Sequence, residues 1–273
     1  MKEPFYHLDY ASGECLFKLY LNEILLLDNI EGKRSLAGNI LLNPFICKSG
    51  SQKLRFELFP KEGDSLLNTN TFIEIYLYVV DQASGFKDRE ELTPRGTRLP
   101  MSTLVNDNKQ LIPPPISWNT EFEANVPYSI DESWNNGYNI MDIPEYENKV
   151  KAFYKDLYQL VQLGEVVKIK ELMVDCFQRT NTTLFEEEEN DTYTIFENLI
   201  KQRPVAGIIY KIQDLEFGSI RVYKEQMVVD ALRRDGSPML LFKENVHDSI
   251  GVSIDIRLFC PKDKNSDKTF RII

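Results

Sequence analysis

The pattern of apolar and polar residues along the chain changes at Asp142. Before this residue, apolar side chains recur at every second position in short runs separated by turn-forming residues, as expected for β-strands. After it, about sixty residues show the 3.6-residue period of amphipathic helices, and the period then returns to two. The pattern predicts an α+β protein with two domains, residues 1–141 and residues 142–273.

Short alternating runs in the first half predict an antiparallel β-sandwich. Apolar and polar residues alternate from Phe17 to Leu21, and a second apolar run at 24–27 follows Asn22, which is typical of a hairpin turn. Further strands are expected at 54–58 and 72–80, and the second of these is nearly all β-branched or aromatic, as in a central strand covered on both faces. Strands that recur with turns between them favour a sandwich.

Residues 85–115 carry no sustained period and include three consecutive prolines, so we expect a long loop. A loop of this length is either mobile or functional, and binding residues are often carried on loops. We therefore expect a binding surface here that includes Phe86 and Arg89. A passive surface excursion is the alternative interpretation.

Helical periodicity in the second half predicts three helices. Asp142-Ile143-Pro144-Glu145 matches a capping box, in which the Asp and Glu side chains accept hydrogen bonds from backbone amides at the helix start. One apolar stripe then runs from Tyr146 to Val161, and Gly164 is placed to end this helix. A second helix is expected at about residues 165–179 and a third at 192–201.

Alternation returns after Ile208 and predicts an antiparallel sheet under these helices. Asp235-Gly236 between two apolar runs is a strong hairpin signal, and residues 252–258 alternate as one strand. Residues 264–267 are expected to turn the chain into a last strand at 270–272. Helices followed by a curved antiparallel sheet resemble the cone-shaped domains of the nuclear-transport-factor-2-like superfold.

That resemblance implies a ligand pocket between the helices and the sheet. The aromatic residues that we expect to line this cavity are Tyr154, Phe177, Tyr210, Tyr223 and Phe242. In the alternative interpretation they fill the core.

The 273 residues are 42% apolar, which is enough for two hydrophobic cores, and the formal net charge is −10. Residues 1–145 contain 13 Lys and Arg against 21 Asp and Glu, and the remainder contains 19 against 21. An acidic first half repels nucleic-acid phosphates and anionic membrane surfaces, and it suits a basic protein partner. The acidic run with Glu186, Glu187, Glu188 and Glu189 is either a solvated loop or a further contact for that partner.

Residue types that carry chemistry are sparse. The only histidines are His7 and His247, no serine lies in a G-x-S-x-G sequence, and no Cys-x-x-Cys pair is present. The sequence also has no Gly-rich phosphate-binding loop. We therefore expect no catalytic residue, no metal site and no cofactor.

The four cysteines, Cys15, Cys47, Cys176 and Cys260, have no paired spacing, so we expect buried free thiols, while their even number leaves disulfides open. The N-terminal residues lack the apolar core of a signal peptide, and the longest apolar run, at 24–27, is far short of the roughly 20 residues that span a bilayer. These features predict a soluble, cytoplasmic protein without a membrane span.

Four short sequences in the first quarter of the chain resemble uncharacterised bacterial two-domain proteins with a strand-rich first half and an α+β second half. They are Leu21-Asn22-Glu23-Ile24, Asn43-Pro44, Lys48-Ser49-Gly50 and Pro60-x-x-Gly63. Some small acidic proteins of this general kind are immunity proteins that neutralise secreted toxins. The resemblance therefore implies a protein-binding role.

We expect a non-enzymatic module that binds a basic protein, with Phe86, Trp118 and Trp134 as apolar anchors beside Arg89. One alternative is a small-ligand binder or an enzyme that uses the cavity of the second half. Another is an exported adhesion module. The sequence leaves the partner and the oligomeric state open.

Overall fold

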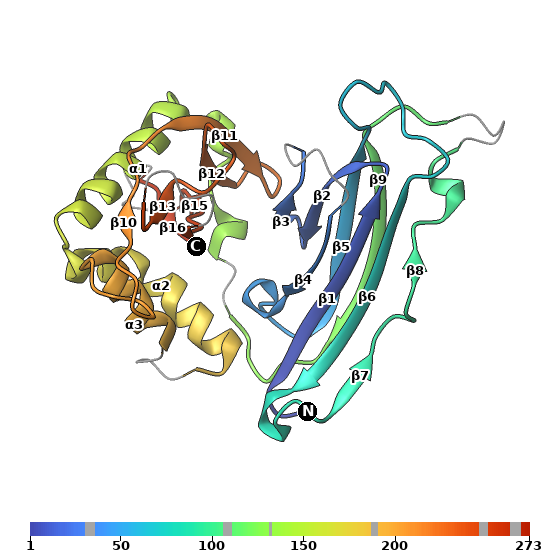
Figure 1. The fold of residues 1–273 in the computed structure, drawn as a ribbon, viewed down its shortest axis with the longest axis horizontal. Coiled ribbons are helices and arrows are strands. Elements are labelled where there is room, and N and C mark those ends of the chain that lie inside the picture. The colour runs from blue at the N-terminus through green and yellow to red at the C-terminus, as the bar shows by residue number, and fades with distance from the viewer. Residues whose placement is uncertain (31–35, 106–110, 131–132, 187–190, 246–250, 263–268) are drawn as a thin grey trace. The chain divides into compact units, whose positions relative to one another are not determined.

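The computed structural model of this chain describes residues 1–30, 36–105, 111–130, 133–186, 191–245, 251–262 and 269–273. The chain divides into two compact units, Met1–Asp131 and Glu132–Ile273. The described part of the first unit consists of strands and short 3₁₀ turns, and that of the second contains α-helices followed by strands (Figure 1). The predicted α+β class, with a β-sandwich in the first half, is confirmed.

The described strands of the first unit form two antiparallel sheets. The strands of one sheet are β1 (Pro4–Gly13), β4 (Ala37–Leu41), β6 (Phe72–Asp81), β7 (Arg89–Glu91) and β8 (Thr97–Arg98). Those of the other are β2 (Leu16–Leu21), β3 (Ile24–Asp28), β5 (Gly50–Phe59) and β9 (Ile116–Ala124). The first sheet has the order β4-β1-β6-β7, with β8 also paired to β6, and the second has the order β3-β2-β5-β9.

The core of the first unit lies between these sheets. Alternate residues of β1 and β6 point inward, so Leu8 and Leu77 are paired across the two strands and almost fully buried. Phe17 of β2 and Phe56 of β5 belong to the same core, with ring centroids 6.0 Å apart. The opposite face of β1 and β6 is therefore turned away from the core.

The predicted hairpin at Asn22 is confirmed. Asn22 and Glu23 both have positive φ, 49° and 65°, as a two-residue turn between right-twisted strands requires. The Asn22 side chain also accepts the Lys53 amide at 3.0 Å, which ties the turn to β5.

The expectation of a loop throughout residues 85–115 is wrong for its first part. β7 and β8 both pair with β6 and together form one interrupted edge strand. At the interruption, the Leu77 amide donates to the Thr93 hydroxyl at 2.9 Å, and Pro94 follows. Charged residues and a proline hide the period of two that identifies a strand, and they also protect a sheet edge from further pairing.

Three helices lie in the described part of the second unit, α1 (Tyr146–Gln162), α2 (Val166–Leu184) and α3 (Asp191–Ile200). α1 buries the stripe Val150, Tyr154, Leu157 and Val161, as its period predicts. Gly164, with φ +68°, ends the helix and donates its amide to the Val161 carbonyl at 3.1 Å.

The predicted capping box at Asp142 is wrong. Asp142 closes a 3₁₀ turn, η5 (Ile140–Asp142), whose cap is the side chain of Asn139. Glu145 is the residue before α1, but its backbone is left-handed (φ +56°) and its side chain caps nothing. The Asp142 amide, to which the Glu145 side chain would bond in the box, instead donates to the Asn139 carbonyl at 3.1 Å within the 3₁₀ turn.

Where the second unit is described, its strands form two hydrogen-bonded ladders. One contains β10 (Lys211–Ile212), β13 (Leu240–Lys243) and β14 (Val252–Ile254), in the order β10-β13-β14. The other contains β11 (Phe217–Tyr223), β12 (Val228–Arg233), β15 (Leu258–Phe259) and β16 (Arg271–Ile272), in that order. The Asp235-Gly236 turn is present, with Gly236 at φ +79°, but it joins strands of different ladders.

The strand expected at 252–258 is broken into β14 and β15. Ile256, at the break, is buried, and its carbonyl accepts the Tyr154 hydroxyl at 2.5 Å. Residues 255–257 belong to neither β14 nor β15, and the bond from α1 is made to the backbone in this gap. The turn expected at 264–267 lies outside the described residues.

The segment before α1 packs on the second unit, which places the boundary at Asp131 and Glu132 rather than at Asp142. The Tyr138 amide donates to the Cys260 carbonyl at 2.8 Å. Trp134 is buried, with the Arg179 guanidinium 5.3 Å from its ring. These contacts make the segment part of the second core.

All four cysteines are free thiols, and Cys15, Cys47 and Cys260 are buried, whereas Cys176 is half-buried. Burial raises the pKa of Cys15 to about 12. A thiol with this pKa carries almost no thiolate near neutral pH, so Cys15 is a packing residue rather than a nucleophile.

A buried ion pair joins β11 to β12. Arg221 donates to both carboxylate oxygens of Asp230, at 2.8 and 2.6 Å, and Tyr223 donates its hydroxyl to the same group at 3.3 Å. The Asp230 side chain is 2% exposed, and burial raises its pKa even with Arg221 beside it. The carboxylate therefore depends on Arg221 to remain ionised at this site.

A fragment that begins at Glu132 should unfold cooperatively, because it keeps Trp134 and Tyr138. A fragment that begins at Asp142 loses both, and its free energy of unfolding should be lower by about 3 kcal/mol, as for removal of a buried Trp. Urea denaturation of the two fragments measures the difference. Equal stability would show that residues 132–141 do not belong to the second unit.

Replacing Arg221 alone by Met should lower the free energy of unfolding by about 3–5 kcal/mol, since it leaves the Asp230 carboxylate buried without its partner. The double variant Arg221→Met/Asp230→Leu should recover most of that loss. Lys151→Met, which removes an exposed ion pair with Glu147, is the control and should change stability by less than about 1 kcal/mol. A double variant as unstable as the single one contradicts this account.

Candidate functional site on the outer face of the first sheet

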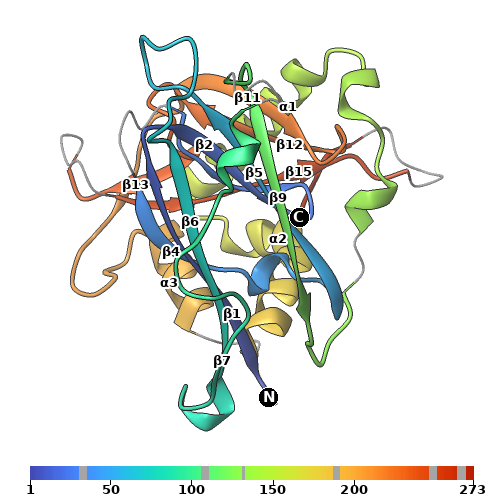
Figure 2. The same ribbon diagram turned by 90° about the vertical axis from the view of Figure 1, so that its right-hand side faces the viewer.

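The outward-pointing residues of the first sheet form a face of aromatic and charged side chains, here called the outer face. Because Leu8 and Leu77 point into the core, their neighbours on β1 and β6 point the other way. Figure 2 shows β1, β6 and β7 side by side in this sheet. The residues of the outer face used below are His7, Asp9, Asn39, Phe72, Glu74, Tyr76, Tyr78, Arg89, Glu91, Arg95 and Arg98.

Three flat side chains stack across neighbouring strands of this face. His7 of β1 and Tyr78 of β6 are nearly parallel, with ring centroids 5.2 Å apart and an interplanar angle of 12°. On β7, the guanidinium of Arg89 lies 3.8 Å from the Tyr78 centroid and 5.1 Å from that of Tyr76. Tyr76 and Tyr78 also stack on each other at 5.1 Å. The rings therefore fix the position of an exposed arginine.

The other two arginines of the face are paired with carboxylates. Arg95 lies 4.9 Å from the Tyr76 ring and 3.6 Å from the Glu91 carboxylate, and Tyr76 donates its hydroxyl to the same carboxylate at 2.7 Å. Arg98 donates to Glu74 at 2.6 Å. Among the described residues, Arg89 has no such carboxylate partner.

The β4 side of the face carries a polar network. The Asn39 amide donates to Asp9 at 2.6 Å, and its oxygen lies 3.2 Å from Nδ1 of His7. Burial, and in the same direction the charge of Asp9, raise the pKa of Tyr78. The phenol therefore stays protonated near neutral pH.

The turn between β6 and β7 presents Phe86 at one end of the face. Phe86 is 55% exposed and has φ +63°, a left-handed conformation that is unusual for a bulky residue. Its amide donates to the Asp81 carbonyl at 3.0 Å, and its ring meets Phe5 edge to face at 6.0 Å. A large apolar side chain is thus held in solvent by a strained backbone.

Two side chains hold this turn in shape. The Asp81 carboxylate accepts the amides of Lys2 and Glu3, each at 3.0 Å, and that of Ala83 at 3.2 Å. The bond from the Glu3 amide is the main cause of a lowered pKa at Asp81. Ser84 donates its hydroxyl to the Asp81 carbonyl at 2.8 Å, which closes the turn from the other side.

Two of the predicted binding residues, Phe86 and Arg89, lie in the turn before β7 and on β7 itself, and the others belong to different parts of the chain. Trp118 is buried in the first core, stacked on Phe56 at 5.4 Å, and Trp134 is buried in the second unit. Neither indole is available as an exposed anchor. Glu186 follows the end of α2, and Glu187, Glu188 and Glu189 lie outside the described residues.

The aromatic residues expected to line a cavity belong to the second core. Tyr154, Tyr223 and Phe242 are buried, and Phe177 and Tyr210 pack against the same core with part of each ring exposed. Tyr154 is fixed by its bond to Ile256. These positions correspond to the interpretation in which the aromatic residues fill the core.

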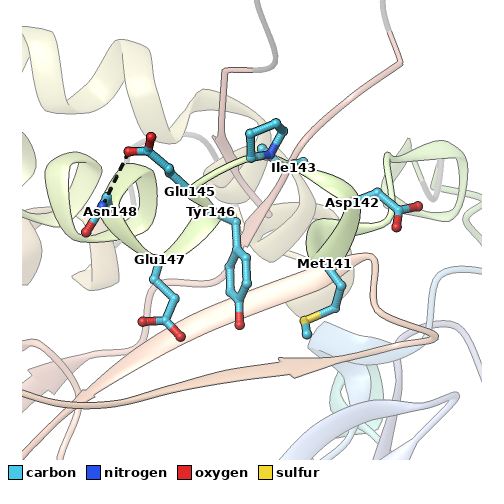
Figure 3. A pocket seen from close by; sticks show the side chains of 8 residues that line it. Met141, Asp142, Ile143, Glu145, Tyr146, Glu147 and Asn148 are labelled. Atoms are coloured by element: carbon cyan, nitrogen blue, oxygen red, sulfur yellow. Dashed lines mark hydrogen bonds between the residues drawn. The ribbon is translucent and has the colours of Figure 1, made fainter.

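Two hollows of the second unit are lined by residues other than these five aromatic residues. One, of about 490 Å³, is formed by Met141–Asn148, the segment that leads into α1. Figure 3 shows Glu145 and Asn148 at one end, joined by a 3.5 Å hydrogen bond, and Asp142 at the other. The carboxylates do not converge. A second hollow, of about 290 Å³, is lined by Phe153, Glu171, Leu172, Val174, Asp175, Phe270, Arg271 and Ile272.

His7, Tyr76 and Tyr78 are not among the site residues that the sequence predicts. Residues 72–80 have the pattern of a strand covered on both faces, because aromatic residues count as apolar in such a pattern. The signal that could have identified them is the alternation of Glu74, Tyr76 and Tyr78 with aliphatic residues, which is typical of a strand with one face in solvent.

In the parts of the chain that the structure describes, no helix is both long and apolar enough to cross a membrane. No group of His, Cys, Asp and Glu among those residues is arranged to hold a metal ion. Comparison of the chain with protein-family models, curated proteins and solved structures finds no match. The function is therefore argued from the outer face itself.

Phe86→Gly should be more stable than Phe86→Ala by about 1 kcal/mol, because only Gly adopts a positive φ without strain. Both variants lose the same contact with Phe5, so their difference isolates the backbone. Thermal or urea unfolding of the two variants measures it. A more stable Ala variant would mean that the turn is not left-handed at residue 86 in solution.

Proposed function

We propose that this chain is a non-enzymatic protein-binding module whose contact surface is the outer face together with the β6–β7 turn. The observation that supports this most directly is Phe86, an exposed aromatic ring on a strained and multiply bonded turn, three residues before the stacked Arg89. A protein keeps a strained, exposed aromatic residue at a cost in stability, which is common where the residue binds a partner.

The composition and rigidity of the face suit protein recognition. Binding energy at protein interfaces is concentrated in a few aromatic and Arg residues. Here Tyr78 and Arg89 are held by stacking and Phe86 by its turn, so little side-chain freedom would be lost on binding. The face is therefore prepared for a partner before the partner arrives.

Charge distribution favours a basic partner. The acidic excess of the chain lies in its first half, where it would attract a basic protein over distances of about 10 Å at moderate salt. An immunity protein that neutralises a basic toxin has these properties, and we propose it as the biological role. Association should then slow as salt rises.

A second candidate function rests on the 290 Å³ hollow between α1, α2 and β16. Its lining includes the buried Phe270 and Ile272, and Leu172 and Val174, which are 43% and 45% exposed. The charged residues Glu171, Asp175 and Arg271 complete the lining. Mainly apolar walls with a few charged groups suit a small, largely apolar ligand. A melting shift with small apolar compounds that Leu172→Ser abolishes would favour this function.

Affinity capture from the native organism tests the main proposal. The wild-type chain should retain a protein partner, and Phe86→Ser should weaken its binding by about tenfold or more, as expected for an interface hot spot. Leu66→Ser, at an aliphatic residue of the same unit that is 42% exposed, is the matched control and should bind as wild type. Equal binding by all three proteins, or turnover of a substrate by the pure protein, contradicts the proposal.

A further inference from the structure

Arg89 is the arginine of the outer face whose position is set by rings rather than by carboxylates. Its guanidinium lies 3.8 Å from the Tyr78 centroid, and Tyr78 is in turn stacked on His7 from the other side. A guanidinium that stacks through its flat face keeps the N–H groups along its edge available. The stack therefore orients the donors of Arg89 without using them.

Two carboxylates of the outer face, those of Glu91 and Asp9, are engaged elsewhere. Glu91 is bound by the Tyr76 hydroxyl and faces Arg95, and Asp9 is bound by the Asn39 amide at 2.6 Å. Glu90 points to the opposite side of the sheet, by the alternation of β7. In agreement, the pKa of Tyr6, which is buried on that side, is raised mainly by burial and further by the charge of Glu90.

We propose that Arg89 binds a carboxylate of the protein partner, through paired hydrogen bonds from the edge of its guanidinium. The proposal rests on the protein-binding function argued above. Planar carboxylates match the two parallel donors of Arg, and such bidentate pairs are among the strongest hydrogen bonds in proteins. Because the surrounding unit is acidic, one carboxylate at Arg89 would be the exception in a basic partner surface, and it would fix the partner's register.

Selection of displayed random 12-residue peptides on the full-length protein tests this even while the partner is unidentified. Peptides selected on the wild type should carry Asp or Glu at one fixed position, among basic residues elsewhere. Arg89→Gln should bind a selected peptide at least tenfold more weakly, and Arg89→Lys should bind with intermediate strength because Lys keeps the charge and loses the paired donors.

Arg203→Gln is the matched control, since Arg203 is an exposed arginine of the second unit and does not belong to the outer face. It should bind the selected peptides as wild type does. If Phe86→Ser releases the peptides but they lack a fixed acidic residue, the carboxylate assignment is wrong while the protein-binding function stands. If no peptide binds in a way that depends on Phe86 or Arg89, both proposals fail.

Competition separates the possible anions. Acetate should displace a selected peptide from the wild type more effectively than chloride at equal ionic strength, and Arg89→Gln should abolish that difference. Displacement by inorganic phosphate at much lower concentration than acetate would overturn the carboxylate assignment in favour of a phosphorylated ligand.

Discussion

The alternation of β6 is the constraint on which the first unit depends. Its inward row, from Ile73 to Val79, is buried in the sandwich core, so the register of β6 against β1 cannot shift by one residue without exposing that row. The same register sets the outward row and places Tyr78 between His7 and Arg89. Packing on one side of the strand thus determines the chemistry on the other.

Local signals in the sequence are reliable where a residue type is favoured at a position for a single conformational reason. Asn22 in a two-residue turn, and Gly164 after the stripe of α1, both lie where the backbone needs a positive φ. The capping box at Asp142 fails because a 3₁₀ turn competes for the same amides. β7 and β8 are not predicted, because an interrupted and charged edge strand shows no two-residue period of apolar side chains.

The site is harder to predict than the fold, because the sequence alone does not show on which face of a sheet an aromatic side chain lies. Trp118 and Tyr78 both lie in strands, yet Trp118 fills the core and Tyr78 faces solvent. The position of Phe86 and Arg89 in an unpatterned segment predicts a binding surface. The structure places Arg89 beside a ring stack that comes from β1 and β6, and Phe86 in the turn before it, against Phe5. Contacts between strands distant in sequence, such as His7 with Tyr78, are set by tertiary packing alone.

The carboxylate of Asp81 joins the amino-terminal residues to the turn that carries Phe86, beside the backbone bond from the Gln82 amide to the Glu3 carbonyl at 2.9 Å. It binds the amides of Lys2 and Glu3 at the beginning of the chain, and the amide of Ala83 within the turn that carries Phe86. Fluctuations of the amino-terminal residues and of the turn are therefore thermodynamically linked, and whatever orders one also orders the other. The order of the amino-terminal segment, which lies outside the outer face, therefore influences how firmly the turn holds Phe86.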